Sequence, residues 1–146
     1  MKKFTQLALT GVIVLGGLGM GAVADLPMVP GGQIQKAAAA SAYGVSVNTT
    51  KANWTNSEMV NLTFKNDNSY EVKLVGQLQY LENGSWVNKG QSYEPYALPE
   101  EHFGHHLDPI GTDGTYRYRT AVYKVDPNTG AQTFQGYVYT SNFYVK

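Results

Sequence analysis

The sequence of 146 residues contains no cysteine. This absence excludes a disulfide framework, a thiol nucleophile and any metal centre with cysteine ligands. Charged residues make up only 15% of the chain and the formal net charge is zero, so the basic field typical of nucleic-acid-binding proteins is missing. No G-x-S-x-G nucleophile motif is present. We therefore expect no nucleic-acid partner, no covalent catalysis and no cofactor.

The first residues have the order of a secretory signal peptide. Lys2 and Lys3 precede an apolar, glycine-rich run over residues 7–23, which ends in the small-x-small triplet Ala22-Val23-Ala24. We predict a signal peptide over residues 1–24, with position 42 as the alternative cleavage point because Ala40-Ser41-Ala42 is a second small-residue site. No cysteine follows the run, which excludes a lipoprotein anchor. The expected product is secreted, extracellular or associated with the cell envelope, without a stable membrane anchor after cleavage.

The composition changes at residue 43. Residues 25–42 contain two prolines, a Gly-Gly pair and an alanine run without a sustained period, which indicates a linker or propeptide. Residues 43–146 are rich in β-branched and aromatic residues that alternate with polar ones. The sequence therefore predicts one all-β domain over residues 43–146.

Alternation of apolar and polar residues predicts about seven strands and no amphipathic helix after residue 42. The clearest segments are residues 43–49, 58–66, 71–81, 114–125 and 132–146, and Gly76 is expected at a bulge or close approach. Turn signals separate them, namely Asn66-Asp67-Asn68, Asn83-Gly84 and the stretch DPNTG at 126–130. This pattern favours an antiparallel β-sandwich, with a small barrel as the alternative.

Two stretches resemble bacterial immunoglobulin-like domains. One is "DGTYRYRTAVYKV", where a turn, Gly114 and Tyr116 open the penultimate strand, and the other is "VNLTFKNDNSYEVKLVGQLQYLENGSW", which ends in a hairpin leading to Trp86. The resemblance implies an immunoglobulin-like sandwich in which Tyr116 is the corner tyrosine and Gly114 and Trp86 are structural. Tyr118 stands where antibody domains have a cysteine. The resemblance bears on fold rather than on activity.

All three histidines, His102, His105 and His106, lie within the stretch "PEEHFGHHLDPI". They converge only in a helix, where positions i, i+3 and i+4 share a face. A strand instead turns His105 away from the other two and separates those by roughly 13 Å, too far for one zinc ion. We expect a strand or loop here, and keep the three as weak metal-ligand candidates. A metal-dependent enzyme is the third functional hypothesis.

The eleven tyrosines all follow residue 42. Most are expected to pack half-buried strands. Candidate binding residues are Tyr93, Tyr96, Tyr137 and Tyr139, which could dock a protein or stack on sugar rings. The leading hypothesis is a secreted, non-catalytic immunoglobulin-like module that binds a protein or glycan at or near the bacterial cell envelope. The alternative is a secreted proteinase inhibitor that presents a loop over residues 92–101, stiffened by Pro95 and Pro99.

Overall fold

The computed structural model describes residues 40–146, which form eleven β-strands and no helix. The strands are β1 (Ala40–Ala42), β2 (Val45–Thr49), β3 (Asn53–Trp54), β4 (Val60–Asn66), β5 (Val72–Glu82), β6 (Ser85–Tyr93), β7 (Tyr96–Ala97), β8 (His102–Leu107), β9 (Gly114–Val125), β10 (Gln132–Tyr139) and β11 (Phe143–Val145). The all-β prediction is confirmed. The predicted signal peptide and most of the predicted linker lie outside the described residues. Within residues 40–146, no helix is long and apolar enough to cross a lipid bilayer.

The number of strands exceeds the seven expected from alternation. The additional elements are β1, β3, β7 and β11, each of only two or three residues. Alternation cannot be recognised over so few residues, because a period of two needs several repeats to stand out. The remaining seven strands have five residues or more.

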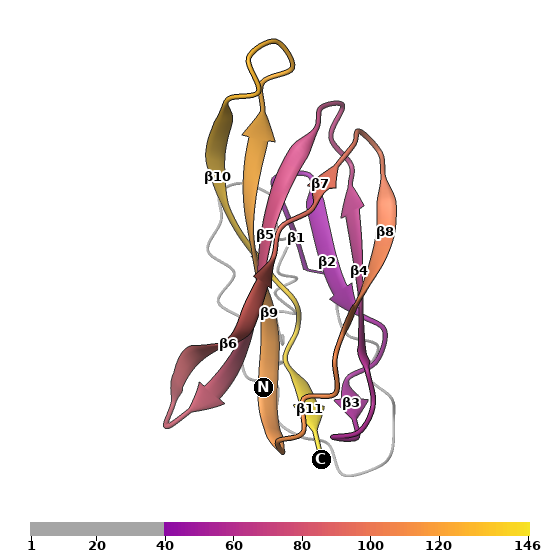
Figure 1. Cartoon of the computed structure of the whole chain (residues 1–146), viewed down its shortest axis with the longest axis vertical. Coiled ribbons are helices and arrows are strands. Elements are labelled where there is room, and N and C mark those ends of the chain that lie inside the picture. The colour runs from indigo at the N-terminus through magenta and orange to yellow at the C-terminus, as the bar shows by residue number, and fades with distance from the viewer. Residues whose placement is uncertain (1–39) are drawn as a thin grey trace, which may run out of the picture.

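The strands form two separate sheets, so the fold is not a closed barrel (Figure 1). Sheet A has the order β1-β2-β4-β8. Sheet B has the order β3-β11-β9-β5-β6, with β10 also paired to β9 and β7 also paired to β5. All pairs are antiparallel except β3 with β11. The β5–β6 hairpin extends away from sheet A at one end of the molecule (Figure 1).

The hydrophobic core lies between the two sheets, because each strand turns its alternate apolar residues toward the other sheet. Sheet A contributes Val45, Val47, Val60, Leu62 and Phe64, and sheet B contributes Val72, Leu74, Tyr116, Tyr118, Val122, Val138, Phe143 and Val145. Phe64 packs its ring on Phe103 at 5.2 Å and meets Tyr118 edge-on at 6.1 Å. The alternating pattern read from the sequence is therefore the pattern of burial.

Two tight hairpins use residues in the left-handed region. Asn83 and Gly84 join β5 to β6 with φ values of 49° and 80°, which confirms the turn expected from Asn-Gly. Tyr43 and Gly44 join β1 to β2 in the same way, with φ values of 55° and 67°. Tyr43, expected at the start of the first strand, instead lies in the turn that follows β1.

The last predicted strand, residues 132–146, is interrupted. β10 and β11 both pair with β9, but residues 140–142 bulge out between them. At this break the buried Thr140 hydroxyl accepts a hydrogen bond from the Tyr118 backbone N–H at 2.9 Å. Consequently β9 is followed by two strands and is not the penultimate one. The expectation for Gly76 is confirmed, since the register shifts beside it and the Tyr118 ring lies directly over its Cα.

The three residues expected to be structural occupy different environments. Tyr116 is fully buried and its hydroxyl donates to the Thr112 carbonyl at 2.9 Å, which is the contact that a corner tyrosine makes. Gly114 opens β9 with a φ of 153°, and the Tyr80 ring lies against it. Trp86 is only half-buried and lies on the outer face of sheet B, where the Arg117 guanidinium lies over its ring. The tryptophan of the core is Trp54, with 5% of its surface exposed.

Candidate functional site

The three histidines do not form a cluster. They lie on the edge strand β8, where His102 and His106 are exposed and His105 turns toward sheet B. His106 shares a hydrogen bond of 2.6 Å between its Nδ1 and Asn61 Oδ1 on the neighbouring strand. No group of three or more histidine, aspartate or glutamate side chains within residues 40–146 is arranged to hold a metal ion. The strand geometry expected from the sequence is confirmed.

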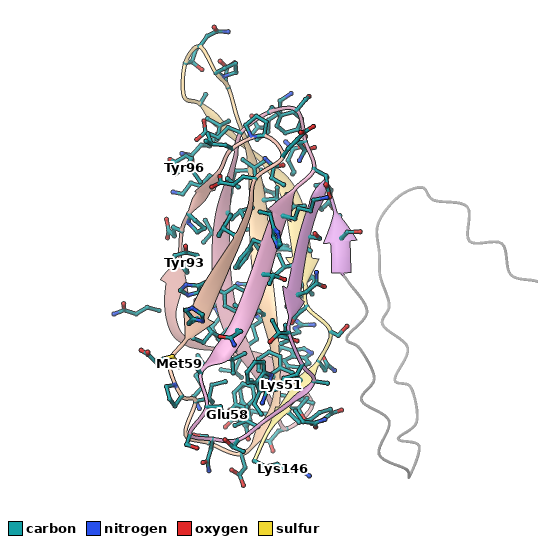
Figure 2. The ribbon with its side chains drawn as sticks, turned by 90° about the vertical axis from the view of Figure 1, so that its right-hand side faces the viewer. Lys51, Glu58, Met59, Tyr93, Tyr96 and Lys146 are labelled. Carbon is teal, nitrogen blue, oxygen red and sulfur yellow. The ribbon has the colours of Figure 1, made fainter. Side chains whose placement is uncertain are left out.

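His105 has a structural partner in the other sheet. Its ring stacks on the Tyr93 ring of β6 at a centroid distance of 3.7 Å and an interplanar angle of 2°. Burial lowers the pKa of His105, and the neighbouring His106 lowers it further, while Asp108 acts in the opposite direction. One face of the Tyr93 ring is thereby covered, so this candidate binding residue joins the two sheets along their open edge (Figure 2).

Residues 92–101, the segment of the inhibitor hypothesis, are partly paired within sheet B. Ser92 and Tyr93 end β6, and Tyr96 and Ala97 form β7, which pairs with β5. Further hydrogen bonds tie the segment down, from Leu74 N–H to the Pro95 carbonyl at 2.9 Å and between the backbones of Leu98 and Glu101. Within this segment Ala97 is fully buried in the core.

The outer face of sheet B carries most of the exposed aromatic side chains. It also carries Arg117 and Arg119. Along β9, residues 116, 118, 120 and 122 are buried, so 117, 119, 121 and 123 face outward. The register places Tyr96, Lys73, Tyr123 and Phe134 in one row across four strands. A parallel row contains Gln77, Arg119 and Tyr139. Residues far apart in sequence thus form one continuous surface.

Ring contacts run across this surface without a break. The Arg117 guanidinium lies 4.2 Å from the Trp86 ring centroid and 4.4 Å from that of Tyr139. Arg119 lies 4.9 Å from the Tyr137 ring. Tyr139, Tyr137, Phe134 and Tyr123 follow one another at centroid distances of 6.3, 5.1 and 5.3 Å. We call this surface the aromatic–arginine face, and it consists of Trp86, Arg117, Arg119, Tyr123, Phe134, Tyr137 and Tyr139.

A polar ladder fixes the arginine at the centre of the face. Arg117 Nε donates to Gln79 Oε1 at 2.8 Å, and Gln79 Nε2 donates to Asn88 Oδ1 at 3.0 Å. Gln79 is 4% exposed, and its register neighbours on the adjacent strands are Asn88 of β6 and Arg117 of β9. Partial burial lowers the pKa of Arg117 from its ordinary value, but a guanidinium remains protonated. The face therefore presents a permanently charged group held in a fixed plane.

Four candidate binding residues were identified from the sequence, and the structure separates them. Tyr137 and Tyr139 belong to the aromatic–arginine face. Tyr96, 49% exposed, is at its border, where its hydroxyl accepts a hydrogen bond from Gln132 Nε2 at 2.9 Å. Tyr96 lies nearer than Tyr93 to the end of the molecule that carries the β9–β10 turn (Figure 2).

Sequence reasoning missed the arginines, Phe134 and the position of Trp86. A signal for the arginines was present, since "YRYR" places Arg117 and Arg119 on the face opposite the buried Tyr116 and Tyr118. No such signal exists for Trp86, whose contact with Arg117 depends on β5 lying between β6 and β9.

Comparison with known proteins gives no family for this chain. No protein-family model matches the sequence, and no curated protein matches it significantly. The function must therefore be inferred from the chemistry of the aromatic–arginine face.

Proposed function

We propose that this chain is a secreted, non-catalytic module with an immunoglobulin-like β-sandwich, which binds a protein or glycan at or near the bacterial cell envelope. Export is proposed from Lys2, Lys3 and the apolar run that follows them. The immunoglobulin-like relationship is proposed from the two stretches around Trp86 and Tyr116, together with the two-sheet fold. Binding is proposed from the aromatic–arginine face.

The observation that carries the binding proposal is an exposed, preorganised set of rings on a rigid sheet. Phe134 and Tyr137 are 48% and 44% exposed, although both are large apolar side chains. They are the middle members of the ring series that runs from Tyr123 to Tyr139 and on to Arg117. Exposed aromatic groups that adjoin one another, on regular secondary structure, are typical of binding surfaces rather than of an ordinary solvated face.

The test compares binding by the full chain and by two double variants in which the substituted side chains are exposed to a similar degree. The binding variant is Phe134→Ser with Tyr137→Ser. The control is Met59→Ser with Leu98→Ser, which removes apolar side chains that are 54% and 58% exposed outside the aromatic–arginine face. Each protein is applied to a glycan array and to immobilised envelope proteins from a bacterial source. Thermal melts establish that the variants remain folded.

We expect the wild type and the control variant to bind the same target, and the Phe134→Ser/Tyr137→Ser variant to lose at least about tenfold in affinity, equivalent to ~1.4 kcal/mol. Equal binding by both variants would show that the face is not the binding surface. A wild type that binds neither array nor envelope proteins at micromolar concentrations would contradict the binding function itself.

A further inference from the structure

The chain contains only two arginines, and both lie on the aromatic–arginine face. Arg117 and Arg119 are two residues apart on β9, so their side chains leave the same face about 7 Å apart along the strand. The other nine basic residues of the chain are lysines. Arginine differs from lysine in offering a planar fork of donors that matches a carboxylate.

Neither arginine has a carboxylate partner in the described part of the chain. The three ion pairs there all use lysines, in the pairs Lys51–Glu58, Lys65–Asp67 and Lys73–Glu94. Strands β6, β9 and β10 contain no acidic residue, and β5 contains only its last residue, Glu82. The face thus has two cations whose charge the described residues leave uncompensated.

Both guanidinium groups are held in place by contacts that leave donors available. Arg117 lies between the rings of Trp86 and Tyr139, and its hydrogen bond to Gln79 uses Nε rather than the terminal nitrogens. Arg119 lies over the Tyr137 ring. Because these side chains are already ordered, a ligand that pairs with them pays little further conformational entropy.

The residues around the arginines favour a protein over a glycan. Trp, Tyr, Phe and Arg are enriched in the cores of protein interfaces, whereas Lys, Glu and Asp are depleted there, and Trp, Tyr and Arg are the commonest hot spots. Phe134 in addition has no polar atom in its side chain to hydrogen-bond a sugar hydroxyl, although it is 48% exposed. The exposed apolar ring beside the two cations therefore fits an apolar group next to carboxylates.

We propose that the partner of the aromatic–arginine face is a protein whose docking segment presents carboxylates to Arg117 and Arg119, next to apolar side chains that cover Phe134 and Tyr137. This inference rests on the proposed binding function and adds the chemistry of the partner. The carboxylates form charge-assisted hydrogen bonds with the guanidinium forks, and the apolar contact supplies the area that is removed from water.

The probe is a library of random linear peptides displayed on phage, selected against the immobilised full chain. Selected peptides are synthesised and their affinities are measured at low and at high salt. Each is also synthesised with Gln and Asn in place of Glu and Asp, and polygalacturonate is tested in parallel as an acidic polysaccharide. The variants are Arg117→Gln, Arg119→Gln and, as a matched loss of one charge outside the face, Lys124→Gln, whose side chain lies over Tyr70.

We expect peptides enriched in acidic and apolar residues, about tenfold weaker binding after Arg117→Gln or Arg119→Gln, and binding within about twofold of wild type for Lys124→Gln. The Gln and Asn peptides should bind as weakly as the arginine variants do. Melting curves that match those of the wild type are required of each variant. Affinity should fall with added salt, because salt screens the attraction between the guanidinium groups and the carboxylates.

Four results would overturn the inference. Peptides without acidic enrichment, or arginine variants that bind like the wild type, would show that the partner is not acidic. Binding to polygalacturonate without binding to any peptide would identify a glycan as the occupant. In each of these cases the binding function survives if Phe134→Ser/Tyr137→Ser still abolishes binding, and it fails if that variant binds normally. A selection that yields no peptide also overturns a protein partner of this chemistry.

Discussion

His105 of sheet A and Tyr93 of sheet B stack face to face, and this pair links the two edges that the sandwich leaves open. The Tyr93 ring also approaches Phe64 in the core, at a centroid distance of 6.3 Å. A titratable ring thus takes part in the packing between the sheets. The sequence, read alone, gave no partner for His105.

Stability should fall as the pH is lowered through the range in which histidine titrates. Burial holds the pKa of His105 below its usual value of 6.5, so the unfolded chain takes up a proton that the folded chain resists. The full stability is therefore present above about pH 6.5, and it decreases from there down to the lowered pKa of the folded state. Denaturant melts between about pH 7.5 and 5.5, above the range of most carboxylates, measure the loss.

The matched variants for this pH effect are His105→Phe, which keeps an aromatic ring on Tyr93, and His102→Gln, which removes an exposed histidine. His105→Phe should flatten the pH dependence, whereas His102→Gln should leave it as in the wild type. A slope that persists unchanged in His105→Phe would mean that another group titrates.

Asn66 should be among the most sensitive polar residues of the domain. Its fully buried side-chain amide donates to the carbonyls of Tyr70, Ala97 and Leu98 at 2.9 to 3.1 Å, and its Oδ1 accepts from Asn68. Asn66→Ala leaves these buried groups unpaired and should cost ~2–4 kcal/mol of unfolding free energy in urea melts. The exposed turn residue serves as the control, since Asn128→Ala should change stability by less than ~0.5 kcal/mol.

The same chemical change should have different effects at two neighbouring tyrosines. Tyr116→Phe removes a hydroxyl that donates to Thr112 and should cost ~0.5–1.5 kcal/mol, while Tyr116→Ala also opens a cavity and should cost ~3–5 kcal/mol. The Tyr118 hydroxyl is buried without a hydrogen-bond partner among the described residues, and burial raises its pKa. Tyr118→Phe should therefore be neutral or stabilising, because it removes a desolvated polar group. Chemical denaturation of the three variants decides this, and a Tyr118→Phe that is clearly destabilised would reveal a partner for that hydroxyl.

The mass of the exported protein should correspond to cleavage after residue 24 rather than after residue 42. Removal of 42 residues would delete β1, whose residues Ala40 and Ala42 pair with Val47 and Val45. It would also leave the left-handed turn at Tyr43 and Gly44 without its first strand. Intact-mass spectrometry of the protein from the medium tests the position, and a full-length mass there would contradict export by signal cleavage.

The sequence predicts those parts of the fold that depend on local pattern. The alternation of Val60, Leu62 and Phe64 is visible in sequence because one face of β4 is buried in the core and the other is not. Asn83-Gly84 is predictable because few other residue pairs adopt positive φ at both positions. The turn at Tyr43 escaped prediction for the same reason, since a tyrosine with a φ of 55° is unusual.

The candidate site depended instead on information that a single sequence does not contain. Tyr137 and Tyr139 could be proposed as binding residues from their type and alternation. The contact of Arg117 with both Trp86 and Tyr139 requires the strand order β6-β5-β9-β10, which follows from pairing between distant segments. Tyr93 and Tyr96 were grouped because they are close in sequence, yet Tyr93 packs between the sheets and Tyr96 borders the outer face.

The parallel pair of β3 and β11 places Trp54 beside Val145, so sheet B is completed by two segments that are far apart in the chain. Pairing of β3 with β11 closes a very long loop, and because the entropic cost of that closure is large, the contact forms late in folding. Trp86, by contrast, lies opposite Leu81 across a hairpin with two turn residues. The two tryptophans therefore report opposite extremes of contact order. During refolding, the hairpin contact of Trp86 with Leu81 should form early, and its contact with Arg117 should follow once β5 pairs with β9. The environment of Trp54 should become native-like only with the slow, cooperative closure of the domain.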